Sequence, residues 1–164
     1  MEQGFYEKLR RWMEARPGRI PAAKLLTGLL PALVYGAYPL LLGYLWAFRQ
    51  PELLRSVLVP AAGFLIVTVL RAGLNFPRPY EVLGIPPLVE KETAGKSFPS
   101  RHAACAGVIA VTALKTLPPL GVFLSLVALG ICLSRVLAGV HFLRDVVAGL
   151  LLGAGIGVLG MYVI

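Results

Sequence analysis

Charged residues are scarce in this chain of 164 residues: they make up 15% of it, whereas 57% is hydrophobic and the mean hydropathy is +0.77. A soluble globular protein cannot hide that much apolar surface. Acidic residues are half as frequent as basic ones, 8 against 16. Six of the basic residues lie in the first 24 residues, and most of the others flank apolar runs. This distribution is typical of an integral membrane protein whose bases meet lipid headgroups, and it argues against a nucleic-acid partner.

Cysteine is scarcer still. Cys105 and Cys132 lie in apolar stretches without the spacing of metal ligands, so we expect two buried thiols that pack as small hydrophobic residues. A continuous apolar core is missing from residues 1–20, which are mixed and charged. A cleaved signal peptide needs such a core, and we therefore expect the N-terminus to be retained.

Residues 1–24 form a basic amphipathic segment. Apolar residues recur in it at three- and four-residue steps, with charged residues elsewhere on the helical wheel, and the apolar positions are Phe5, Leu9, Trp12 and Met13. The pattern predicts an interfacial amphipathic helix that ends at Pro17-Gly18. An anchoring flank is the favoured role of this helix, and recruitment to anionic lipid is the alternative.

Apolar blocks fill most of the remaining chain, and a helix needs about 20 residues to cross the hydrocarbon core of a bilayer. The blocks, extended to their nearest polar ends, are 25–48, 52–71, 100–117, 120–140 and 146–164. The stretch 75–100 is rich in proline and charge, so it must be a loop at the membrane face. We therefore predict an all-α, polytopic membrane helical bundle: about five transmembrane helices in a single domain, 25–164, behind the interfacial helix.

A stripe of small residues marks the last predicted span, where Gly149, Gly153 and Gly157 recur every four residues. Such a stripe lets another helix approach closely. It can form the seam of a homodimer, although packing against a helix of the same chain is the favoured interpretation.

Polar residues gather at the ends of the predicted spans, where charge is costly and therefore a candidate for function. They are Arg71 and Arg78 after the second span, Ser100, Arg101 and His102 at the start of the third, Ser134 and Arg135 late in the fourth, and His141, Arg144 and Asp145 at the start of the fifth. If successive spans alternate in direction, all four groups fall on one membrane face. Both histidines of the chain belong to this set.

The composition of the set favours phosphate chemistry. Several arginines without balancing acids suit a phosphate group, because guanidinium forks match its oxygens. The same positive charge would repel a divalent cation, so we expect no metal and no cofactor. His141 and Asp145 share a helix face, so the carboxylate can fix the imidazole tautomer and leave the other nitrogen free to attack phosphorus. His102 can then protonate the leaving oxygen.

These residues resemble a known three-part signature. The parts are Arg71-x6-Arg78-Pro79, Pro99-Ser100-Arg101-His102 and Ser134-Arg135-x5-His141-x3-Asp145, which are similar in order and spacing to the type-2 phosphatidic acid phosphatase superfamily. The resemblance implies metal-independent hydrolysis of a lipid phosphate through a phosphohistidine. It makes His141 the nucleophile, Asp145 its orienting acid and His102 the general acid. The phosphate-binding residues that it implies are Arg71, Arg78, Ser100, Arg101 and Arg135.

Two positions depart from the family pattern. Arg71 stands where the first motif usually has lysine, which keeps the charge but changes the geometry of the contact. Arg101 stands where the second motif often has glycine. The side chain of Arg101 either adds a contact to a diphosphate or crowds the pocket, and we favour the added contact.

The expected substrate is a membrane lipid. Polyprenyl (undecaprenyl) diphosphate is the first choice, and phosphatidate or phosphatidylglycerol phosphate is the alternative. A non-catalytic phospholipid-binding or transport protein is a candidate from another class, and a vanadate-dependent oxidant like the related haloperoxidases is a remote third. The presence of His102, His141 and Asp145 argues against a pure binder, which would need only the arginines.

Charge and family resemblance disagree about which side of the membrane holds the site. With five spans, the N-terminus and the polar set lie on the same side. The basic N-terminus then favours the cytoplasm. The family resemblance instead implies a site outside the cytoplasm, and we expect a multi-pass protein of the inner cell membrane with an extracytoplasmic catalytic face.

Overall fold

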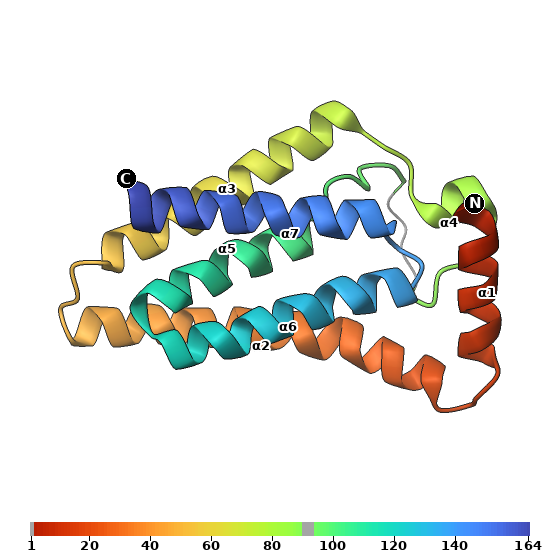
Figure 1. The fold of residues 1–164 in the computed structure, drawn as a ribbon, viewed down its shortest axis with the longest axis horizontal. Coiled ribbons are helices and arrows are strands. Elements are labelled where there is room, and N and C mark those ends of the chain that lie inside the picture. The colour runs from red at the N-terminus through yellow and green to blue at the C-terminus, as the bar shows by residue number, and fades with distance from the viewer. Residues whose placement is uncertain (1, 90–93) are drawn as a thin grey trace.

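The computed structural model describes residues 2–89 and 94–164, and these residues contain helices and loops but no strand. Seven α-helices and a C-terminal π-helical turn follow one another along this part of the chain (Figure 1). Their bounds are α1 (Glu2–Glu14), α2 (Arg19–Ala47), α3 (Leu53–Leu74), α4 (Pro79–Leu83), α5 (Arg101–Thr116), α6 (Pro118–Leu137), α7 (Leu143–Val158) and η1 (Leu159–Val163). The all-α prediction is confirmed.

Four helical stretches are long and apolar enough to cross a bilayer: Arg19–Ala47, Leu53–Leu83, Pro118–Leu137 and Leu143–Val163. Large apolar side chains point outward along them, and Leu40, Trp46 and Leu151 are 76%, 74% and 67% exposed. An outer surface of this kind is costly in water and stable against lipid tails. The chain is a multi-pass membrane protein.

Helix α5 is the shortest of the five predicted spans. Its 16 residues extend about 24 Å, which is less than the roughly 30 Å hydrocarbon core. Ten of them are buried, most of them small, and α2, α3, α6 and α7 all contact this helix (Figure 1). It ends at Thr116, and Pro118 opens α6 after one linking residue, a position that proline favours. The predicted bundle is therefore four long helices around a short central one.

The glycine stripe of α7 faces this central helix. A methyl group on Gly149 would overlap the carbonyl oxygen of Ser100, and one on Gly153 would overlap the carbonyl oxygen of Ala104. Gly157 lies against Val111 in the same way. All three glycines are buried inside one chain, so a second copy cannot reach them without opening the bundle. The stripe therefore serves packing within one chain, which was the favoured interpretation, and the possible homodimer stays a prediction.

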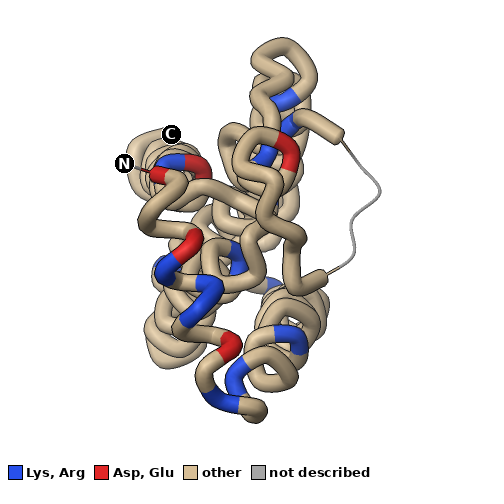
Figure 2. The backbone as a smooth tube through the Cα atoms, turned by 90° about the vertical axis from the view of Figure 1, so that its right-hand side faces the viewer, with Lys and Arg blue, Asp and Glu red and all other residues tan. Residues whose placement is uncertain are grey.

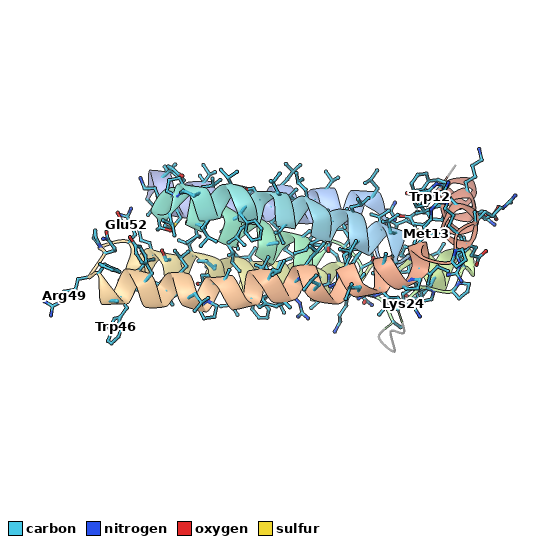
Figure 3. The ribbon with its side chains drawn as sticks, turned by 90° about the horizontal axis from the view of Figure 1, so that it is seen from below. Trp12, Met13, Lys24, Trp46, Arg49 and Glu52 are labelled. Carbon is cyan, nitrogen blue, oxygen red and sulfur yellow. The ribbon has the colours of Figure 1, made fainter. Side chains whose placement is uncertain are left out.

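Helix α1 lies across one end of the bundle. Trp12, Met13 and Lys24 mark that end, and Trp46, Arg49 and Glu52 mark the other (Figure 3). The predicted apolar face is only partly the buried one. Tyr6 and Met13 are 5% and 2% exposed, whereas Phe5 and Trp12 are each 50% exposed. The helix therefore packs on the bundle through Tyr6 and Met13 and leaves two aromatic side chains facing outward.

The segment predicted as a loop, 75–100, is irregular in its described part except for the five-residue helix α4. Residues 90–93 of this segment lie outside the described part of the chain. Cys105 is buried, as predicted, whereas Cys132 is only half-buried, and both are free thiols. Figure 2 looks onto the end of the bundle where α1 lies, and it shows basic positions on α1 and on the elements behind it.

Candidate active site

A cavity of about 460 Å³ opens between the end of α3 and the start of α5. Five residues of the predicted set line it: Arg71 from α3, Arg78 from the following loop, Arg101 and His102 from α5, and His141 from the α6–α7 loop. Thr68, Ala72, Ala94, Gly95 and Lys96 complete its wall. Alternating helix directions bring these distant parts of the sequence to one membrane face, as expected.

His141 forms part of the cavity wall, and Asp145 lies behind it. The Nδ1 atom of His141 is 3.5 Å from Oδ2 of Asp145, and both side chains are 1% exposed. Asp145 occupies the first turn of α7, where the helix dipole favours a carboxylate, and its Oδ2 accepts the Phe142 backbone N–H at 3.0 Å. The pair therefore has a fixed orientation, with the Nε2 side of the imidazole left for a ligand.

Burial lowers the pKa of His141 to about 4, although the hydrogen bond to Asp145 opposes this shift. The nearby charges of Arg78 and Arg71 lower the pKa further. The imidazole is therefore neutral at neutral pH, which is the form that can act as a nucleophile.

Two buried arginines border this histidine, and backbone carbonyls hold both of them. Arg71 is 9% exposed and donates to the Pro99 carbonyl at 2.8 Å. Arg78 is 2% exposed and donates to the carbonyls of Gly95 at 3.0 Å and Val140 at 3.2 Å. Each guanidinium has five N–H donors, so donors are left for an anion in the cavity.

Ser100 connects the two halves of the site. Its backbone N–H donates to the Asp145 carbonyl at 2.8 Å, and its own carbonyl accepts from Ala104 in the first turn of α5. The Ser100 side-chain oxygen is buried and has no hydrogen-bond partner among the described residues. The start of α5, with its unpaired N–H groups, is thereby fixed beside the His141–Asp145 pair.

Ser100 and Arg135 are the two predicted phosphate ligands that do not line this cavity, and the side chain of Arg135 is held elsewhere. Its Nη2 donates to the Thr27 carbonyl of α2 at 3.1 Å. The side chain lines a neighbouring hollow together with Lys24 and Leu88. Arg135 lies in the last turn of α6, and there its side chain turns toward α2 rather than toward His141.

Two residues of the site were not predicted from the sequence. Ser97 is fully buried; its hydroxyl donates to Oδ2 of Asp145 at 2.5 Å and lies 3.4 Å from Nδ1 of His141. Lys96, next to it, adds a fourth basic side chain to the cavity wall. Lys96 and Ser97 lie three and two residues before the second motif, and this proximity is the one sequence signal that could have found them. Among the described residues, no group of three or more His, Cys, Asp or Glu side chains is placed to hold a metal ion.

Comparison with proteins of known sequence gives two findings. The model of the PAP2 superfamily matches residues 52–164. An undecaprenyl-diphosphatase from Sulfolobus acidocaldarius is 37% identical over 87 residues, which are 52% of this chain and 42% of that protein. The alignment therefore spans less than half of that relative.

Comparison with solved structures extends the similarity to nearly the whole fold. The crystal structure of Aquifex aeolicus LpxE has a TM-score of 0.74 at 29% identity, covering 94% of this chain and 92% of its own. The first transmembrane PAP2-type phosphatidylglycerolphosphate phosphatase from Bacillus subtilis has a TM-score of 0.75 at 25% identity, covering 97% and 82%. The predicted resemblance is thus confirmed, and the chain belongs to the PAP2 superfamily.

Proposed function

We propose that this enzyme hydrolyses a lipid diphosphate, polyprenyl diphosphate being the preferred substrate, through a metal-independent phosphohistidine intermediate. The observation that carries the proposal is the cavity wall, where Lys96 and Arg101 add to the buried pair Arg71 and Arg78. The buried pair adjoins His141, whereas Lys96 and Arg101 are exposed. One phosphate therefore binds beside the nucleophile and the second binds among the outer bases.

In the first step, Nε2 of His141 attacks the terminal phosphorus and forms an N–P bond. The bond from that phosphorus to the bridging oxygen breaks, and its electron pair leaves with the lipid monophosphate. His102 donates a proton to the leaving oxygen. Asp145 accepts the Nδ1 proton of His141 in a hydrogen bond and stabilises the positive charge that develops on the ring.

In the second step, water attacks the phosphohistidine. His102, now neutral, removes a proton from the water as the P–N bond breaks, and inorganic phosphate and free His141 result. Arg71 and Arg78 stabilise the charge on the phosphoryl oxygens in both steps, together with the hydroxyl of Ser100 and the N–H groups at the start of α5. Arg135 contacts the ligand only if its side chain leaves Thr27.

The alternative substrates are phosphatidate and phosphatidylglycerol phosphate. Similarity to the Sulfolobus undecaprenyl-diphosphatase supports the diphosphate, and similarity to the Bacillus phosphatidylglycerolphosphate phosphatase supports phosphatidylglycerol phosphate. The four bases of the cavity favour the more highly charged diphosphate.

We also propose an inner-membrane location with the catalytic face outside the cytoplasm. Family resemblance supports this orientation, while the excess of basic residues in segment 1–24, whose helix α1 lies at the end of the bundle that holds His141, opposes it. A cysteine introduced at exposed Lys96 decides between the two orientations. It is treated with a membrane-impermeant thiol reagent before and after the membrane is opened, and labelling of intact cells is expected. Labelling only after the membrane is opened would place the site in the cytoplasm.

The function is tested by phosphate release from detergent-purified protein with a metal chelator present. Polyprenyl diphosphate, phosphatidate and phosphatidylglycerol phosphate are compared as substrates, each with the wild type and with His141→Ala. We expect release that survives the chelator, is fastest with the diphosphate and disappears in the variant. Release that needs a metal, or that persists without His141, contradicts the mechanism, and binding without release from any lipid supports a phospholipid-binding protein.

A further inference from the structure

Helix α1 lies outside the region that the family model matches, which begins at residue 52. It nevertheless packs directly on the catalytic end of the bundle (Figure 1). Tyr6 joins a hydrophobic cluster that includes Phe142 and Val146, and Met13 joins a second cluster that includes Ala138 and Val140. These two anchors place α1 against the loop between α6 and α7, which carries His141.

Tyr6 contacts the nucleophile itself. Its hydroxyl donates to the backbone carbonyl of His141 at 3.1 Å, and this hydrogen bond is buried. Its ring meets the ring of Phe142 edge to face, with centroids 5.7 Å apart. Burial raises the pKa of Tyr6 to about 12, so the phenol keeps its proton and remains a donor at every pH at which the enzyme is expected to work.

The α6–α7 loop is held by its carbonyl groups. The Leu88 N–H donates to the Ala138 carbonyl at 2.9 Å, and Arg78 donates to the Val140 carbonyl at 3.2 Å. Tyr6 adds the contact to the His141 carbonyl. Leu88 and Arg78 belong to the family-matched region, whereas the donor nearest the nucleophile comes from α1.

Three further polar contacts join α1 to its surroundings in the described part of the chain, and all are exposed. Glu2 is 3.8 Å from Arg144, Arg10 donates to the Pro86 carbonyl at 3.0 Å, and Arg19 of α2 donates to the Trp12 carbonyl at 2.5 Å. Exposed ion pairs contribute little to stability. The buried hydrogen bond of Tyr6 is therefore the contact through which α1 acts on the loop.

We propose that Tyr6 is a positioning residue that holds His141 in line between Asp145 and the substrate phosphate. Tyr6 does not line the cavity, so it acts through the His141 backbone and not on the substrate. A shift of the loop would lengthen the separation of 3.5 Å between His141 and Asp145 and misalign the attacking nitrogen. The inference rests on the proposed phosphohistidine function.

The test is the variant Tyr6→Phe, which removes only the hydroxyl and keeps the ring packing. A matched control exists at the other end of the bundle, where Tyr38 donates to the Ser56 carbonyl at 2.6 Å. We expect Tyr6→Phe to lower kcat for polyprenyl diphosphate about three- to tenfold with KM unchanged. Tyr38→Phe should leave kcat unchanged even if its melting temperature falls as much.

A second measurement separates positioning from general stability. In an Asp145→Asn background His141 has already lost the carboxylate with which Tyr6 keeps it aligned. Adding Tyr6→Phe to that background should therefore lower kcat by less than about twofold further. Three results would each overturn the inference. They are an unchanged kcat in Tyr6→Phe, a loss of kcat in the Asp145→Asn background as large as in the wild type, and equal losses of kcat in Tyr6→Phe and Tyr38→Phe. None of these results affects the proposed function, which fails if the wild type releases no phosphate, if release needs a metal, or if His141→Ala still releases phosphate.

Discussion

The two ends of the bundle carry similar residues in different environments. At the catalytic end Arg71, Arg78 and His141 are 9%, 2% and 1% exposed, and neighbouring elements hold each of them through backbone or side-chain contacts. At the other end the bases Arg55 and Lys115 are exposed. Arg55 donates to the carbonyl of Ile164, and Lys115 lies over the ring of Tyr162.

This difference shows which basic residues of a membrane protein deserve a functional hypothesis. Arginine and lysine at a membrane face are expected from headgroup contact alone. Their burial in a shared cavity beside a neutral histidine is not explained by that contact, because buried charge is costly without a partner. If function follows this division, substitutions at the catalytic end should affect turnover and matched substitutions at the other end should not.

The largest effect is expected from His141→Ala, which removes the proposed nucleophile and keeps the arginines. Turnover of the diphosphate should fall by at least about 10³-fold, while binding of the lipid and the melting temperature change little. Arg55→Ala, at the other end, is the matched control and should keep full turnover. Substantial phosphate release by His141→Ala, or a comparable loss in Arg55→Ala, would remove the functional distinction between the ends.

A graded loss is expected behind the nucleophile. Asp145→Asn should lower kcat about 10²- to 10⁴-fold, because the imidazole loses the charge that orients it. Ser97→Ala removes one hydrogen bond to that carboxylate and should lower kcat about tenfold. Ser125, which donates to the Gly121 carbonyl in α6, provides the control, and Ser125→Ala should be silent. Equal activity of the two serine variants would mean that Ser97 plays no part in orienting Asp145.

A change of selectivity is expected at the mouth of the cavity. Lys96→Ala and Arg101→Gly should each lower kcat/KM for polyprenyl diphosphate about tenfold relative to phosphatidate, because the second phosphate loses a charged donor. Lys115→Ala, an exposed base at the other end, should leave the ratio unchanged. An equal loss on both substrates would assign Lys96 and Arg101 to general attraction of anions and not to a diphosphate subsite.

Much of the fold follows from hydropathy, because every spanning helix must satisfy its own backbone in lipid. The apolar blocks therefore predicted the helices to within a few residues, and Pro118 predicted the break between α5 and α6. Hydropathy did not identify α5 as the central helix. Its length of 16 residues and its small side chains make it short, and only the packing of its neighbours shows that it is enclosed.

The candidate site was predictable in part. Arg71, Arg78, Arg101, His102 and His141 meet because alternating helices return to the same face, which the order of the spans already implies. Ser97 and Tyr6 depend on hydrogen bonds across 48 and 135 residues of sequence, and no local pattern encodes such contacts. Arg135 has the predicted spacing, but the direction of its side chain depends on the Thr27 carbonyl of a distant helix.

The smallest expected effect concerns stability at low pH. His141 has a pKa of about 4 in the folded protein because it is buried, against about 6.5 in an unfolded chain. Between these values the unfolded state binds more protons, so the stability due to neutral His141 is complete above pH 6.5 and declines as the pH falls toward 4. The melting temperature should therefore drop by several degrees from about pH 7 to about pH 5, and by less in His141→Gln, which has no titrating ring. An identical drop in both proteins would mean that His141 titrates normally, and the catalytic end would then differ from the other end in its contacts but not in the protonation of its nucleophile.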